Sequence, residues 1–241
     1  MTALSHCSRL GMLLLIVLIP ALAFAQAPAQ PQPPDRAIIN FMVPIDSNSI
    51  NLLLAVVNNQ VRVGTKKITI VISSPGGDTA SAFAAYNVLK SVPVEITTFN
   101  AGSIDSAAML VYLAGKYRYS FGDPARFLIH GNALTLGTGV PMDFGFLDAQ
   151  LQQIKSLNQM VAQVIASNSN KKQDEVTTLM RGQTILSPEE ARSWGIVHEI
   201  RTTFMEPGAV FVTVNTPAPE EKKPFEYGTM RPPIGSESPT K

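Results

Sequence analysis

Short apolar runs alternate along this chain with segments of helical periodicity, and this alternation restricts the fold more than any other feature. Buried strands are indicated at residues 37–43 and 67–73, where β-branched or other apolar residues follow one another. Shorter runs of the same kind occupy residues 94–99, 126–130 and 196–200, and helical apolar spacing marks residues 49–61, 79–91, 106–114, 142–167 and 173–180. Repeated strand–helix–strand order predicts an α/β fold with a parallel sheet flanked by helices.

A further helix start is visible near the end of this region. Ser187 precedes Pro188, and Glu190 follows three residues after the serine. A serine cap, a proline at the first helical position and a glutamate at the third form a capping box. We expect this helix to end at Trp194-Gly195.

The first 25 residues have the composition of a secretory signal peptide. An apolar run at residues 10–25 follows a single positive charge, Arg9, and closes on Ala23-Phe24-Ala25. The alternative is an uncleaved membrane anchor, but the run is short for a span of about 20 residues and Pro20 interrupts it. We therefore expect the signal to be cleaved and the protein to be secreted or periplasmic.

Charge and cysteine content exclude several kinds of site. Cleavage after residue 25 would remove Arg9 and no acidic residue, so the formal net charge would fall from +1 to 0. A neutral protein has no basic field for nucleic acid, so no nucleic-acid partner is expected. The only cysteine, Cys7, lies within the signal, which excludes disulfides, a thiolate nucleophile and cysteine-bound metal in the mature chain. We expect no metal and no cofactor.

Composition also divides the chain into parts. Residues 26–36 are rich in proline and form an extended spacer. Residues 37–204 contain the predicted strands and helices and would form one domain. Residues 205–241 contain prolines, a run of charged residues and a Ser/Gly/Pro finish, and are expected to be a largely disordered extension.

Three short segments contain the residues that could carry chemistry. The stretch Ser73-Ser74-Pro75-Gly76-Gly77-Asp78 lies between a strand and a helix, where a glycine turn leaves N–H groups free to face an anion. By itself this stretch is better explained as an ordinary turn. Ser106 follows a predicted strand and Gly102 and precedes an apolar helix. This position suits a nucleophile, but it is also the usual position of an N-cap serine.

His130 closes the predicted strand at residues 126–130. Active sites of parallel sheets gather at such strand ends, and imidazole can take a proton from a serine near neutral pH. Alone, His130 could be a structural histidine, and two histidines without clustered carboxylates do not make a metal site. Together, however, a glycine turn, a serine at a helix start and a strand-end histidine are the parts of a serine acyl-transfer site.

These three segments, in this order, resemble the proteolytic subunit of Clp protease, within the crotonase-like superfamily. That family has an SPGG turn, a G-x-x-x-S nucleophile segment and an IH base, which match here from residue 72 to residue 130. The segments 186–191 and 194–197 look like its closing helix and strand. The resemblance covers most of residues 38–200. It implies the family's fold, with a protruding long helix at residues 142–167 that meets its counterpart across stacked rings.

Carried over residue by residue, the resemblance implies a serine endopeptidase with Ser106 as nucleophile and His130 as general base. The backbone N–H groups of Gly77 and Ala107 would form the oxyanion hole, each donor worth roughly 3–4 kcal/mol to the transition state. The family's triad aspartate aligns with Gln183, which can orient an imidazole but cannot stabilise its cation with a full charge. Asp174 is an alternative third member. Reduced activity is expected.

The predicted function is therefore an exported peptidase acting on peptides or unfolded proteins as a homo-oligomeric ring, heptameric by resemblance. Because an exported protein has no ATP supply, we expect it to work without ATP and without an ATP-driven unfoldase. The main alternative is a catalytically inactive oligomeric scaffold or peptide-binding protein. An acyl-CoA hydratase or isomerase is disfavoured by export away from coenzyme A. A Ser/Lys membrane peptidase is disfavoured because no lysine stands out.

Overall fold

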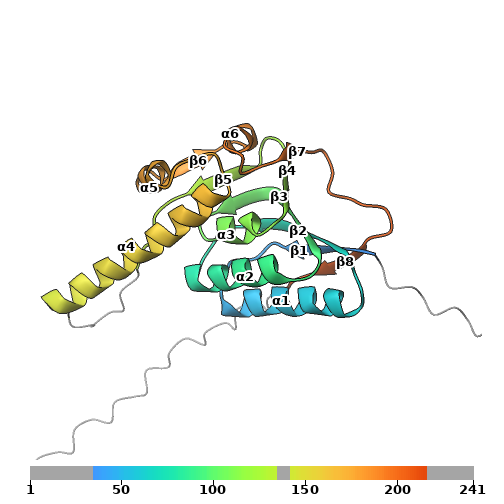
Figure 1. Ribbon diagram of the computed structural model, residues 1–241, viewed down its shortest axis with the longest axis horizontal. Helices are drawn as coiled ribbons and strands as arrows, with labels where there is room; N and C mark the ends of the chain where they lie inside the picture. The colour runs from blue at the N-terminus through green and yellow to red at the C-terminus, as the bar shows by residue number, and fades with distance from the viewer. Residues whose placement is uncertain (1–34, 135–141, 216–241) are drawn as a thin grey trace, which may run out of the picture. The chain divides into compact units, whose positions relative to one another are not determined.

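An eight-stranded sheet runs through the part of the chain that the computed structural model describes, residues 35–134 and 142–215 (Figure 1). Its strands follow the order β6-β5-β3-β2-β1-β8, with β4 joining β3 to β7. Every pairing is parallel except β5 with β6. The strands are β1 Arg36–Phe41, β2 Lys67–Ser74, β3 Glu95–Asp105, β4 Tyr117–Ser120, β5 Arg126–Ile129, β6 Thr184–Leu186, β7 Glu199–Ile200 and β8 Val210–Thr213.

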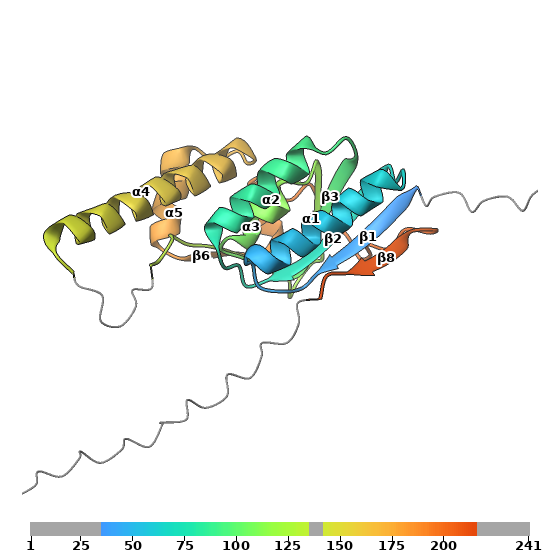
Figure 2. The ribbon, with the colours of Figure 1, turned by 90° about the horizontal axis from the view of Figure 1, so that it is seen from below.

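Six helices are described, and three of them, α1, α2 and α3, lie side by side over one face of the sheet (Figure 1, Figure 2). The helices are α1 Ser47–Arg62, α2 Thr79–Ser91, α3 Ala108–Leu113, α4 Phe144–Ser167, α5 Gln173–Arg181 and α6 Pro188–Ser193. The predicted mixed α/β fold, with a mostly parallel sheet flanked by helices, is confirmed. The predicted capping box of α6 is also present, with the Ser187 side chain accepting from the N–H of Glu190.

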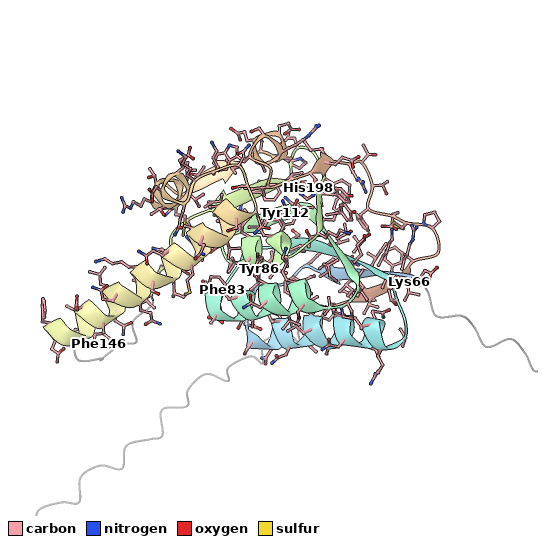
Figure 3. The ribbon with its side chains drawn as sticks, in the orientation of Figure 1. Lys66, Phe83, Tyr86, Tyr112, Phe146 and His198 are labelled. Atoms are coloured by element: carbon pink, nitrogen blue, oxygen red, sulfur yellow. The ribbon has the colours of Figure 1, made fainter. Side chains whose placement is uncertain are left out.

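The main core lies between the sheet and these helices. Apolar side chains at helical spacing on α1, such as Leu53 and Val57, are fully buried against β-branched residues of β1 and β2. Tyr112 of α3 (labelled in Figure 3) is also fully buried. Its hydroxyl donates to the carbonyl of Tyr119 at 3.1 Å. Burial raises the pKa of Tyr112, because the ionised phenolate would lose its hydration.

The opposite face of the sheet carries a smaller aromatic cluster. Phe99 of β3 contacts Phe121 and Phe204 edge to face, at ring-centroid distances of 4.8 Å and 5.6 Å. Phe204 belongs to the segment that leads from β7 to β8, so the chain crosses this face before β8 pairs with β1. Residues 205–215, which the sequence analysis placed in the C-terminal extension, thus contain the edge strand β8.

Several boundaries differ from those predicted. The strand expected at residues 94–99 continues to Asp105, because residues 103–105 pair in parallel with β5. The Asn100 side chain donates to the Arg126 carbonyl and accepts from the Gly102 N–H. The helix expected from Ser106 begins at Ala108, so Ser106 lies in the preceding turn and not in the first helical turn. His130 follows β5 directly and does not belong to it.

The long helix predicted at residues 142–167 is present as α4. Its buried residues, Val161, Ala162 and Ile165, all lie toward its C-terminal end, where it packs on α3 and α5. Phe146 lies at the opposite end, which projects beyond the sheet (Figure 3). None of the described helices combines the length and apolarity needed to cross a bilayer. The signal and most of the spacer predicted at residues 1–36 lie outside the described residues.

Candidate active site

Three neighbouring strands deliver the predicted site residues to one edge of the sheet. β2 ends at Ser74, β3 at Asp105 and β5 at Ile129, and the three strands run parallel in the order β2-β3-β5. Their carboxyl ends therefore meet at the same edge, where ligands of open α/β sheets bind. The segments that follow these three ends are the Pro-Gly-Gly turn, Ser106 and His130.

Ser106 occupies a sharp turn between β3 and α3. Its backbone has φ of 56°, in the left-handed region that non-glycine residues rarely adopt. Its N–H donates to the Leu128 carbonyl at 2.8 Å, and its carbonyl accepts from the Met109 N–H at 3.0 Å. A strained serine at a strand-to-helix turn is typical of nucleophiles that must present their hydroxyl above a sheet.

The Pro-Gly-Gly turn lies directly against this serine. Gly76 and Gly77 both have positive φ, 84° and 146°. Ile45 holds the turn from the other side: its N–H donates to the Gly76 carbonyl and its carbonyl accepts from the Asp78 N–H, each at 2.8 Å. A β-carbon on Gly77 would overlap the Ile45 carbonyl oxygen, so only glycine fits there.

Two backbone N–H groups beside Ser106 are free to bind an anion. Among the described residues, neither the N–H of Gly77 nor that of Ala107 donates a hydrogen bond. The turns that carry them are in contact, because a β-carbon on Gly76, the residue before Gly77, would lie 3.0 Å from the Ala107 nitrogen. Paired, unengaged N–H groups of this kind are what an oxyanion hole requires.

His130 is held by the segment that follows it. Its Nδ1 lies 2.7 Å from the carbonyl oxygen of Gly131. A carbonyl oxygen only accepts, so the proton of a neutral ring is on Nδ1, and Nε2 remains free as a base. Gly131 donates its N–H to the Met180 carbonyl at 3.0 Å, and Asn132 donates both its backbone and side-chain N–H groups to Asn158 Oδ1, at 2.7 Å and 2.9 Å.

Ser106 and His130 line the same two depressions at this edge. One is a small pocket of about 10 Å³ that also contacts Ala107. The other is a cavity of about 490 Å³ that also contacts Gly77. The Ser106 hydroxyl and the His130 ring are not hydrogen-bonded in this structure, and such contacts between catalytic groups often tighten only when substrate binds.

The candidate third members lie outside this arrangement. Gln183 follows α5, is exposed, and has φ of 52°. Pairing of Ile129 with Thr184 places it opposite His130 in the β5–β6 register, but no hydrogen bond joins the two side chains within the described part of the chain. Asp174 lies in the first turn of α5, whereas Gln183 lies just beyond the other end of that helix. Neither residue lines the pocket or the cavity.

Sequence reasoning missed the polar residues that surround the pair. Thr79 donates to Asn132 Oδ1 at 2.5 Å, which joins the start of α2 to the segment after His130. Asn158 accepts from the other side of Asn132, as described above. Asn132 could have been suspected from its place two residues after a candidate base, but Asn158 lies far along a helix and had no local signal.

Metal-binding side chains do not gather here. Within residues 35–134 and 142–215, no three or more His, Cys, Asp or Glu side chains are grouped to hold a metal ion. Among the described residues that line the cavity of about 490 Å³, the one Asp or Glu is Asp78. It caps α2 by accepting from the Ser81 N–H at 2.7 Å. Hydrogen bonds from Ser81 hold the pKa of Asp78 below its usual value, so this carboxylate is ionised at neutral pH.

The stretch of chain that contains this site is matched by a known family. The family model for Clp protease matches residues 34–204, which is most of the chain. This protein belongs to the Clp protease family.

Its curated relatives are distant. It is 28% identical over 139 residues to ATP-dependent Clp protease proteolytic subunit 2 of Frankia casuarinae, covering 57% of this chain and 62% of that protein. It is 30% identical over 136 residues to the subunit 2 of Corynebacterium jeikeium, covering 56% and 64%. These two matches thus span less than two thirds of the relatives' length. Against subunit 1 of Thermobifida fusca, identity is 27% over 168 residues, covering 69% and 74%.

A solved structure agrees with the fold. A point mutant of ClpP1 from Listeria monocytogenes superposes with a TM-score of 0.62 at 20% sequence identity, covering 69% of this chain and 92% of that one. At this level of identity the likeness concerns the fold alone.

Proposed function

We propose that this protein is a serine peptidase in which Ser106 is the nucleophile and His130 the general base. The observation that carries the proposal is that Ser106, His130 and Gly77 line one cavity at the carboxyl edge of the sheet, in a chain of the Clp protease family. The strained backbone of Ser106 and the unengaged N–H groups of Gly77 and Ala107 support it.

In the first half of the reaction, Ser106 Oγ attacks the carbonyl carbon of the scissile peptide bond while Nε2 of His130 takes its proton. The carbonyl oxygen becomes an oxyanion, which the N–H groups of Gly77 and Ala107 stabilise. The imidazolium then donates its proton to the departing amine as the C–N bond breaks. The products of this half are a free amine and an ester between Ser106 and the acyl part of the substrate.

In the second half, water replaces the amine. His130 Nε2 takes one proton from water as the hydroxyl oxygen attacks the ester, and it returns a proton to Ser106 Oγ as the ester bond breaks. The carbonyl of Gly131 keeps the ring oriented through Nδ1 but supplies no full negative charge to the imidazolium. Turnover is therefore slower than in a site with a triad carboxylate.

We further propose that the protein is exported and acts without ATP or an unfoldase partner, on peptides or unfolded proteins. The apolar run at residues 10–25 and its small-x-small end support export. We also propose a homo-oligomer, in keeping with the family. The projecting end of α4 supports assembly, because Phe144 there is 86% exposed and Leu147 and Leu151 are each 48% exposed.

Peptide hydrolysis by the purified protein tests the function. Quenched fluorescent peptides should be cleaved without ATP and without any unfoldase, and Ser106→Ala should abolish the cleavage. Cleavage that needs an added ATP-driven unfoldase would refute ATP independence. A folded protein that cleaves no peptide would favour the alternative of an inactive scaffold. This alternative is tested because His130 has no carboxylate partner within the described residues.

A further inference from the structure

A single ionised carboxylate faces the same cavity as the proposed nucleophile. Asp78 lines the cavity of about 490 Å³ together with Ser106 and His130. One of its oxygens, Oδ2, accepts from the Ser81 N–H. Hydrogen bonds from the Ser81 side chain and the Ala80 N–H also reach this carboxylate, but no Lys or Arg lies within 4.0 Å of it among the residues that the structure describes.

The remaining lining of the cavity is apolar or uncharged. Ala80, Ile154 and Leu157 supply aliphatic surface from α2 and α4. Asn132 and Gln153 supply amides. No other Asp or Glu and no Lys or Arg is among the lining residues that the structure describes, so Asp78 sets the sign of the charge that the cavity presents to a ligand.

We propose that this cavity accepts a lysine or arginine side chain of the substrate, with its cation beside Asp78 and its stem against Ile154 and Leu157. The inference rests on the proposed peptidase function and adds a substrate class to it. Long basic side chains suit such a site because an aliphatic stem packs on apolar surface while the charged end stays with its partner.

The negative charge of Asp78 has two effects within the protein itself. At the N-cap of α2 it interacts favourably with the helix dipole, which asparagine or serine would not do although they cap a helix about as well. A carboxylate next to Gly77 also opposes the oxyanion that the Gly77 N–H would stabilise, since the two negative charges repel. A cation brought by the substrate offsets this repulsion, so Asp78 favours basic substrates in both binding and reaction.

Matched peptides test this directly. One set carries a single arginine at each successive position of an alanine-rich sequence, and a second set carries citrulline, which has the same shape and no charge. The wild-type protein should cleave the arginine peptide faster at one position, with a ratio of kcat/KM of about two- to tenfold, as for a partly exposed ion pair. Asp78→Asn, which keeps the cap, should bring this ratio close to one.

Two controls separate this inference from the peptidase proposal. Asp143→Asn makes the same change at the N-cap of α4, outside the cavity, and should leave the ratio unchanged. Binding of both peptide sets to Ser106→Ala, measured by fluorescence anisotropy, reports the preference without any hydrolysis. If no peptide is cleaved but arginine binds better and Asp78→Asn removes the difference, the cation site stands and the peptidase fails. Equal rates and equal binding for arginine and citrulline, or a preference that survives Asp78→Asn, would overturn the inference.

Discussion

The backbone of Gly76 is packed against the side chain of Ser106. A β-carbon added at Gly76 would lie 2.8 Å from Cβ of Ser106 and 2.5 Å from the carbonyl oxygen of Asp105. Gly76 also has φ of 84°, where any other residue is strained. The turn after β2 is thus fitted closely to the turn that presents Ser106, and the two cannot be altered independently.

We therefore expect Gly76→Ala to reduce kcat/KM for a model peptide by about 100-fold, because a displacement of about 1 Å at a nucleophile has costs of that size. Backbone strain should also lower stability by about 1–3 kcal/mol. Thermal melting separates the two effects. Gly122→Ala is the control, since the nearest atom to its new β-carbon would be 3.7 Å away. A Gly76→Ala protein with normal activity would show that the turn does not position Ser106.

The residue opposite His130 provides a gain-of-function prediction. Gln183 has a left-handed backbone, which aspartate and asparagine tolerate better than most residues. If the missing carboxylate limits turnover, Gln183→Asp should raise kcat by about tenfold or more, because a full charge stabilises the imidazolium. Gln183→Asn should give no such gain. No increase with Gln183→Asp would mean that the Gly131 carbonyl alone supports the ring.

Asn158 should influence catalysis through the segment that follows His130. It accepts two hydrogen bonds from Asn132, and Asn158→Ala would leave both donors without this partner. We expect kcat to fall by about tenfold, since an unmade hydrogen bond of this kind costs about 1–3 kcal/mol. Asn158→Asp keeps the accepting oxygen and should recover most of the rate. Gln159→Ala on the same helix is the control. Equal rates for Asn158→Ala and wild type would show that the anchor is dispensable.

We expect His198 to make the folded protein slightly less stable as the pH is lowered. Nδ1 of His198 accepts from the Arg118 N–H at 3.2 Å. Burial, and then the charge of Arg118, lower the pKa of His198 below 6.5. Below pH 6.5 the unfolded chain therefore binds more protons than the folded one, so stability falls as the pH is lowered through this window.

The melting temperature should thus drop more between pH 7.5 and 5.5 in the wild type than in His198→Asn, which keeps an acceptor but does not titrate. The difference should be small, because the His198 side chain is largely exposed. If the melting temperatures of the two proteins fell equally over this pH range, His198 would not be the source of the pH dependence.

The elements best predicted from sequence were those with local signals at their ends. α2 was predicted from Thr79 to Ser91 and is found there, because Asp78 caps its start and Pro93 follows its end. The short strand β4 was not predicted because its residues, YRYS, do not form an apolar run, and β6 was not predicted because three residues are too few to show a period. β8 was missed because its residues adjoin a tail of disordered composition.

The site shows the same limit. Ser106 and His130 could be chosen from their places after strands, and the structure brings them to one cavity. The left-handed backbone of Ser106 had no signal, because a serine before an apolar helix reads as an ordinary cap. The contact of His130 Nδ1 with the Gly131 carbonyl could not be predicted either. Every residue has a backbone carbonyl, so the sequence does not indicate which one a side chain will contact.

Covalent labelling with a fluorophosphonate tests the central claim most directly. We expect peptide mapping by mass spectrometry to find the label on Ser106, with no labelling of Ser106→Ala and labelling slowed by about 100-fold or more in His130→Ala. Ser103→Ala, which removes a hydroxyl from the same strand end, should be labelled like the wild type. A folded wild-type protein labelled on another serine, or not at all, would contradict the account.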